Sequence, residues 1–275
     1  ESFEEPIRLM GDMMVLAFQR GLHVITRFTS DRATLRARLD SLLEDASLVD
    51  TAPFEEEVRL RQLSRDVGRS TMDSRQRPAR GSTTLLTNSD SMLGGLRFGC
   101  ESAAREAEIE TSRAVRAVAN AMPAFGAFPG RKALILFTET LRADPGGPFY
   151  EACGLSTLAR PSLGLTILPE INDLALKANL ARVSFYPVHA AGLTPLGTSS
   201  GEHSARGFQA GLALSTGGRN SVLMKDPLLP FRQAAADISC HYVLAYRPTK
   251  GLTPGRHTVR VIVKRKGLKA RHSEF

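Results

Sequence analysis

Thr138, Glu139 and Thr140 are well placed to bind a ligand, because they follow directly after an apolar run, residues 132–137. The turn Pro129–Arg131 precedes this run, which is apolar on both faces and ends abruptly at the three polar residues. Such a pattern is typical of a strand buried in the middle of a parallel sheet. Open α/β sheets bind ligands at the carboxyl ends of their strands. The sequence therefore predicts a ligand-binding rim at Thr138, Glu139 and Thr140.

His189 occupies the same kind of position, because it follows the apolar run 183–188. Residues 68–95 are rich in Arg, Ser, Thr and Gly and show no apolar periodicity, which predicts a long loop. We expect this loop and His189 to complete the rim.

Cys153 and His189 also raise the alternative of a hydrolase, since an imidazole can activate a thiol nucleophile. No third residue that would orient the histidine is identifiable, and the sequence around Cys153, residues 150–155, has no nucleophile signature. The six histidines show no spacing typical of metal ligands. We therefore interpret Cys153 as a buried residue and His189 as a rim residue, and we do not expect an enzyme.

The three cysteines, Cys100, Cys153 and Cys240, are too few and too scattered for a disulfide framework or a thiolate metal site. One pair could form in an exported protein, and the third would be left over. The favoured interpretation is that all three are small, mostly buried residues.

The positive charge of the chain is concentrated at its end. The last 29 residues carry nine Lys and Arg side chains against the single acid Glu274, which accounts for the entire net charge of +8. Such a surface could attract nucleic acid, anionic lipid or an acidic partner. The favoured interpretation is that alternation along residues 258–264 places the charges on the solvated face of a strand, where they also protect a sheet edge.

Strands and helices alternate along the chain. Residues 13–18 and 22–28 predict a hairpin, and a helix begins after Ser30, the predicted cap. Further helices are predicted at 53–67, 97–122, 149–158, 169–181, 208–216 and 227–239, further strands at 132–137, 183–188 and 220–223, and a β meander at 241–246, 258–264 and 268–271. This order predicts an α/β three-layer sandwich with a mostly parallel sheet and one antiparallel edge strand, formed by residues 1–239. Residues 240–275 would form a basic C-terminal meander packed on it or extending it. No apolar run is long enough to span a membrane.

Several segments, taken together and in order, resemble the von Willebrand factor type A-related proteins of soil bacteria such as acidobacteria. The segments that carry the resemblance are residues 11–18, 28–31, 129–137, 181–188, 191–193, 215–218, 237–249, 259–264 and 268–271. The resemblance implies a sheet of strand order 3-2-1-4-5-6 and an adhesion-type Mg²⁺ site at the carboxyl ends of the strands. It also implies that the first, central strand lies upstream of residue 1, which would leave its neighbours without a partner and the chain less stable than a longer form.

The metal site that the resemblance implies is incomplete in this sequence. No Asp-x-Ser-x-Ser motif occurs near the start, and Thr138-Glu139-Thr140 stands where the family has Thr-Asp-Gly. Thr83 and Thr84 are candidates for the family's loop threonine. Because Mg²⁺ requires near-ideal octahedral geometry, we expect Glu139 to belong to a degenerate site. No cofactor is expected for these residues, although an upstream segment could supply Mg²⁺ ligands.

These observations lead to the hypothesis of a non-enzymatic protein–protein interaction module whose rim is built from Thr138, Glu139, Thr140 and His189. The resemblance implies a periplasmic or secreted setting. Two alternatives stay open: binding of nucleic acid or an anionic surface through the basic C-terminal segment, and a Cys153–His189 hydrolase.

Overall fold

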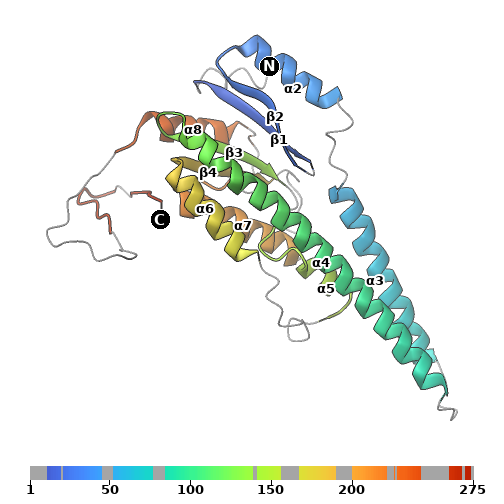
Figure 1. Cartoon of the computed structure of the whole chain (residues 1–275). Helices are drawn as coiled ribbons and strands as arrows, with labels where there is room; N and C mark the ends of the chain where they lie inside the picture. Colours follow the sequence, from blue (N-terminus) through green and yellow to red (C-terminus); the bar gives the residue numbers. More distant parts are fainter. Residues whose placement is uncertain are drawn as a thin grey trace.

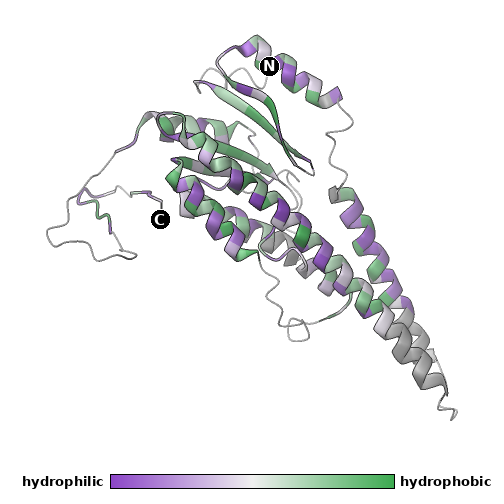
Figure 2. Cartoon of the chain, viewed as in Figure 1, coloured by the Kyte–Doolittle hydropathy of each residue, from purple (hydrophilic) through white to green (hydrophobic). Residues whose placement is uncertain are grey.

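The computed structural model describes residues 11–19, 21–44, 52–76, 84–138, 141–155, 167–189, 200–221, 226, 228–242, 260–267 and 270–273. Within these residues the protein is a mixed α/β structure with seven helices and two two-stranded sheets (Figure 1). Hydrophobic residues run almost continuously along Met13–Gln19 and Lys132–Thr138, whereas the other two strands also carry polar residues (Figure 2). None of the helices in this part of the chain combines the length and hydrophobicity needed to cross a bilayer.

The predicted N-terminal hairpin is confirmed. Strands β1 (Met13–Gln19) and β2 (Gly21–Thr29) pair antiparallel. The ring of Phe28, near the end of β2, lies 4.5 Å from that of Phe128 and 6.5 Å from that of Phe125, so the hairpin packs on the end of a long helix. Helix α2 (Arg32–Glu44) follows, but Asp31 rather than Ser30 caps it, because the Asp31 carboxylate accepts a 3.0 Å hydrogen bond from the amide of Ala33.

A parallel pair of strands forms the centre of the fold. Strands β3 (Lys132–Thr138) and β4 (Val183–His189) pair in register from Lys132 opposite Val183 to Thr138 opposite His189. All of β4 except His189 is buried, whereas β3 is half-buried, with 53% of Phe137 exposed. The central position predicted for β3 therefore belongs to β4. Ser221 forms a parallel bridge to Val188, so β4 has neighbours on both sides, and this bridge is the described part of the strand predicted at 220–223.

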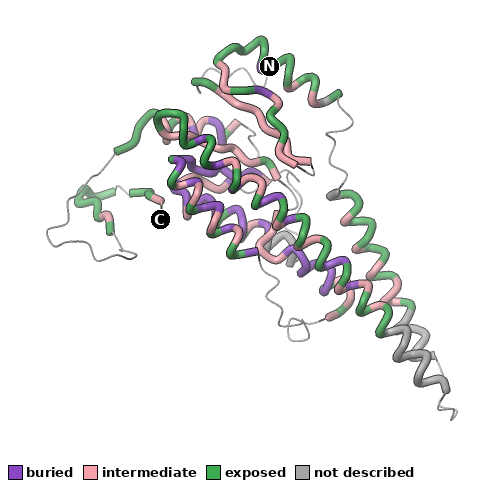
Figure 3. Tube along the Cα trace, viewed as in Figure 1, coloured by how far each residue is buried: buried purple, intermediate pink, exposed green. Residues whose placement is uncertain are grey.

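Helices cover both faces of the parallel pair. Alternate residues of β3 and β4, including Leu134, Leu136 and Phe185, enter the core formed with α4 (Thr84–Gly126), α6 (Leu168–Leu180) and α7 (Ser200–Thr216). The intervening residues face α8 (Leu229–Ser239), where Phe137 contacts Phe231 at a ring-centroid distance of 6.1 Å. The buried positions concentrate on β4 and on the helix faces around it (Figure 3). The mixed α/β class is thus confirmed.

The long loop predicted for residues 68–95 is wrong. Helix α3 (Ala52–Gln76) and helix α4 extend through residues 68–76 and 84–95, and residues 77–83 lie outside the described part of the chain. The two helices lie side by side and project away from the strands (Figure 1), with an ion pair between Arg59 and Glu106. A helix that leaves the core has no need of a long apolar stripe, and Arg is a good helix former, so this segment lacked the periodicity on which the prediction depended. Helix α4 also continues past Pro123 to Gly126, so the proline does not end the helix as the sequence predicted.

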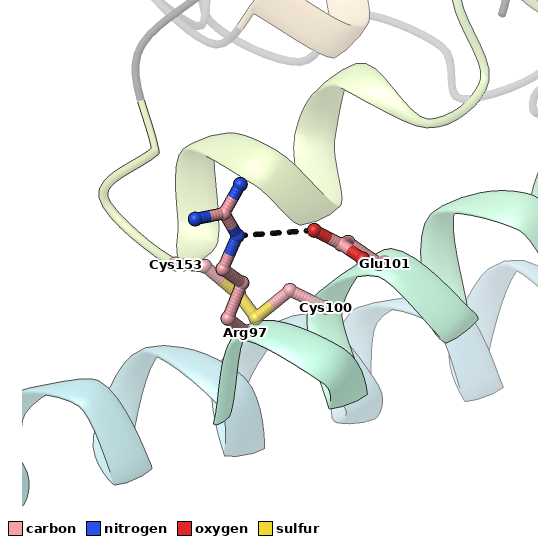
Figure 4. The surroundings of a disulfide bond; sticks show 4 residues. All are labelled: Arg97, Cys100, Glu101 and Cys153. Carbon is pink, nitrogen blue, oxygen red and sulfur yellow. Dashed lines mark hydrogen bonds and ion pairs between the residues drawn. A yellow bond between two sulfur atoms is a disulfide. The ribbon is translucent and has the colours of Figure 1, made fainter. Parts of the chain in front are cut away.

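A disulfide joins Cys100 on α4 to Cys153 at the end of the short helix α5 (Gly147–Ala152). Figure 4 shows the bond beside the Arg97–Glu101 ion pair of α4. It lies next to a small core of Ala103, Ala104, Phe149 and Tyr150. The interpretation of three unpaired cysteines is therefore wrong for two of them, and Cys240, which is free, is exposed rather than buried. The packing of α5 on α4 brings the two Cα atoms to 6.5 Å across a sequence separation of 53, a proximity that spacing alone does not reveal.

The described part of the C-terminal segment contains no strand. Residues 241–242, 260–264 and 270–271 have no regular structure, so the predicted meander is absent at these positions, and its remaining residues lie outside the described part. Alternating residues form a strand when a neighbouring edge accepts their backbone hydrogen bonds. Here the contact back to the body is ionic, between Arg271 and Asp237 of α8.

Loss of the disulfide is expected to destabilise the protein. Replacing both Cys100 and Cys153 by Ser frees a loop of more than fifty residues in the unfolded chain, so we expect the free energy of unfolding to fall by about 2–4 kcal/mol. Urea unfolding of the oxidised protein and the double variant measures the difference, with Cys240→Ser as the control that should leave the midpoint unchanged. Equal midpoints for the double variant and the parent would show that the bond contributes nothing to stability.

Candidate functional site

The parallel pairing brings two predicted rim residues together. Thr138 and His189 are register partners at the carboxyl ends of β3 and β4, and strands in such a pair lie about 4.8 Å apart. They share the sheet face of Leu134, Leu136 and Phe185, because residues two apart along a strand point to the same side. The Thr138 hydroxyl oxygen accepts a 3.3 Å hydrogen bond from the amide of Leu141, which fixes the start of the following loop. Glu139 and Thr140 lie outside the described residues.

Gln209 of α7 lies behind His189. Its amide nitrogen is 3.5 Å from Nδ1 of the His189 ring, and the residue is completely buried. In the tautomer in which Nδ1 accepts from this amide, Nε2 carries the ring proton and can donate a hydrogen bond to an acceptor group of a ligand. The side-chain oxygen of Gln209 has no hydrogen-bond partner in the described structure. The rim thus has a polar group beneath it as well as at its surface.

Sequence reasoning missed Gln209, although a signal was available. One stripe of α7 is buried, and Gln209 falls within it beside Ala205, Phe208, Leu212 and Thr216. A long polar side chain in an otherwise small or apolar stripe carries an unusual desolvation penalty, which marks it as a residue with a specific role.

The described residues do not supply a metal site at this rim. No group of three His, Cys, Asp or Glu side chains in the described part of the chain could hold a metal ion. Thr84, a candidate ligand, is the first residue of α4, about 45 Å along the helix from Val115 in the core. It is therefore too distant to share an ion with the end of β3. Thr83 lies outside the described residues.

The carboxyl group of Glu108 lies against the loop that follows β3, and its surroundings disfavour its ionised form. Glu108 of α4 approaches Gly146, where a Cβ would lie 2.7 Å from its Oε1 atom and 3.1 Å from the Cβ of Ala104, so a larger residue at this position would displace the Glu108 side chain. Burial and, to a smaller extent, the negative charge of Asp144 together raise the pKa of Glu108 to about 7, against the opposing effect of Arg105. Its Oε1 has no hydrogen-bond partner in the described structure.

The same loop is tied to α3 by a second contact. Arg142 forms an ion pair with Glu56, and their side chains are 15% and 18% exposed. Loop 141–147 therefore takes part in a favourable ion pair through Arg142 and in an unfavourable interaction between Asp144 and Glu108. Because this loop starts at the rim and ends at the disulfide-linked helix α5, its packing fixes the surroundings of Thr138.

No protein-family model, no curated protein and no solved structure matches this chain. The site must therefore be understood from its own residues. It offers the hydroxyl of Thr138 and the imidazole of His189, which are hydrogen-bonding groups for a partner surface. Cys153, the one nucleophile weighed from the sequence, is engaged in the disulfide.

Ionisation of Glu108 is expected to make stability depend on pH. The pKa is higher in the folded state than the ordinary value of 4.5, so the folded state binds the proton more tightly and stability falls as the pH rises from about 4.5 to 7. We expect Glu108→Gln to remove this fall and to stabilise the protein at pH 8 by about 1–2 kcal/mol, after allowance for solvent screening.

Thermal or urea unfolding of Glu108→Gln across pH 4–8 measures this effect. The exposed Glu110, two residues farther along α4 and on a different face of the helix, gives the matched control Glu110→Gln. The expectation fails if both variants keep the pH dependence of the parent protein.

Proposed function

We propose that this chain is a non-enzymatic protein–protein interaction module of the von Willebrand factor A type. Its binding rim comprises Thr138, Glu139, Thr140 and His189, and its metal-ion site is degenerate. The observation that carries the proposal is the register of Thr138 and His189 at the carboxyl edge of the parallel pair, with Gln209 buried behind the histidine. This edge is where open α/β sheets present their ligand-binding groups.

The arrangement of strands supports the proposed relationship. Strands β3 and β4 and the bridge at Ser221 lie side by side in chain order and parallel, with helices on both faces of the pair. An antiparallel hairpin precedes them in the chain. This order agrees with one half of a three-layer sandwich with a mostly parallel sheet, whereas the hairpin forms a two-stranded sheet of its own.

The disulfide bears on both the alternative activity and the cellular setting. A hydrolase based on Cys153 and His189 needs a free thiolate, and the Cys100–Cys153 bond removes it. Stable disulfides form in oxidising compartments, so the bond supports a periplasmic or secreted protein. A binding role for the rim is therefore favoured over catalysis.

Site-specific cross-linking tests the rim directly. A photoreactive phenylalanine analogue placed at Thr138 or His189 is expected to capture a discrete protein from the extracytoplasmic fraction of the producing organism, while the same analogue at the exposed Glu110 captures none. With that protein purified, His189→Ala and Thr138→Ala are each expected to weaken binding by about 1–2 kcal/mol, the range of central contacts in interfaces. Capture that is equal at Glu110, or affinity that is unaltered in both alanine variants, would place the interface elsewhere.

A further inference from the structure

The end of the chain is anchored to the body by an ionic cluster around Asp237. The Asp237 carboxylate accepts hydrogen bonds from Arg219 at 2.9 and 3.0 Å and from the Tyr186 hydroxyl at 3.0 Å, and it also pairs with Arg271. Its side chain is 12% exposed. Burial alone would raise its pKa, but these donors together hold the pKa of Asp237 well below its usual range. The carboxylate therefore stays ionised and keeps Arg271 in place.

The backbone after Arg271 packs against the body as well. Gly217 has a φ of +71°, and a Cβ there would lie 3.2 Å from the backbone of His272 and of Ser273. Asp237 and Arg271 are 34 residues apart in the sequence, so the chain between them leaves the body and returns to it. The Asp237–Arg271 pair and the contact at Gly217 hold the returning end at the body.

The described part of this closed segment, residues 260–267, presents an unusual surface. Arg260, Lys264, Arg265 and Lys266 are exposed, and no Asp or Glu occurs anywhere from residue 238 to residue 273. Between these cations, Ile262 is 73% exposed and Val263 is 39% exposed. Near the base of the segment, Tyr242 is 91% exposed.

Cations with exposed apolar side chains among them fit one kind of partner better than others. Anionic lipid attracts each Lys or Arg held near its surface, and apolar side chains gain by entering the boundary between headgroups and acyl chains. Tyrosine is enriched at the same depth, because its ring is apolar and its hydroxyl polar. A nucleic acid would offer nothing to Ile262 and Val263, and residues 260–267 contain no aromatic side chain on which bases could stack.

We infer that residues 260–267 form a membrane-surface binding segment, in which Ile262 and Val263 enter an anionic lipid interface and Arg260, Lys264, Arg265 and Lys266 contact its headgroups. The Asp237–Arg271 pair holds the segment at the body, so the protein is attached peripherally. This binding is separate from the proposed rim and does not depend on it.

Sedimentation with lipid vesicles tests the inference. At 0.1 M salt, the protein is expected to bind vesicles that contain phosphatidylglycerol and not vesicles of phosphatidylcholine alone. Reversing three charges (Lys264→Glu, Arg265→Glu and Lys266→Glu) should weaken binding at least about 100-fold, since each cation near an anionic surface contributes about fivefold. Replacing Ile262 and Val263 by Ser leaves the charge unaltered and should weaken binding about tenfold.

A matched control carries the same change of charge elsewhere. Arg27, Arg32 and Arg38 are exposed on β2 and α2, and their reversal to Glu should weaken binding far less than the reversal at 264–266. Unfolding midpoints of all variants establish that they fold, as substitutions at exposed positions normally do. The inference is overturned by absence of binding to anionic vesicles, by an equal loss in the control variant, or by full binding of the Ile262/Val263 variant. Binding to a DNA duplex as tight as to the vesicles would also overturn it and indicate a nucleic-acid partner.

Discussion

The burial of β4 between two layers of helices constrains most of the structure around it. Phe185 enters the core shared with α4, α6 and α7, and its backbone amide donates a 3.0 Å hydrogen bond to the hydroxyl of Thr216. Tyr186, the next residue, points to the other face and bonds Asp237 of α8. Because consecutive residues of a strand alternate between faces, a shift of one residue would place each in the wrong layer. The fixed register of β4 therefore determines where both the rim and the anchor of the chain end are located.

Helix α4 supplies the common wall for the remaining elements. Its residues from Val115 to Phe125 belong to the core of the parallel pair, and Met14, Leu16 and Phe28 of the hairpin pack against that same core. Farther toward its start, the helix holds α5 through the small core and the disulfide. The two sheets do not need to pair with each other to belong to one folded unit, because one helix buries a face of both.

The sequence predicted the elements that bury apolar surface and missed features that depend on proximity across the chain. The apolar runs at 13–18, 132–137 and 183–188 identified strands, and the faces of 169–181 and 208–216 identified helices, because burial leaves a local pattern. The helical arm over 68–76 and 84–95 projects away from the strands (Figure 1), and its sequence has no such pattern. The Cys100–Cys153 bond and the approach of Glu108 to Gly146 arise from packing of α5 on α4, which no local spacing encodes.

The sequence likewise predicted the candidate-site residues that lie at strand ends and missed the one that depends on how a helix packs. Thr138 and His189 were found because strand ends are readable from the sequence, and parallel pairing then places them together. Gln209 comes from a helix that follows β4 in the chain, and its contact with His189 depends on how α7 crosses the sheet. Among the described residues, the proposed rim combines these groups without three His, Cys, Asp or Glu side chains that could hold a metal ion.

The central claim is that this rim binds a protein partner without a metal ion. Calorimetric titration of the protein with Mn²⁺, which takes the same oxygen ligands as Mg²⁺, tests the claim most directly. We expect no saturable heat up to about 1 mM metal, because the ligand set is incomplete and Mg²⁺, for which Mn²⁺ stands in, demands near-ideal octahedral geometry. Binding of one ion per chain that is lost in Glu139→Gln would instead establish a metal-dependent adhesion site.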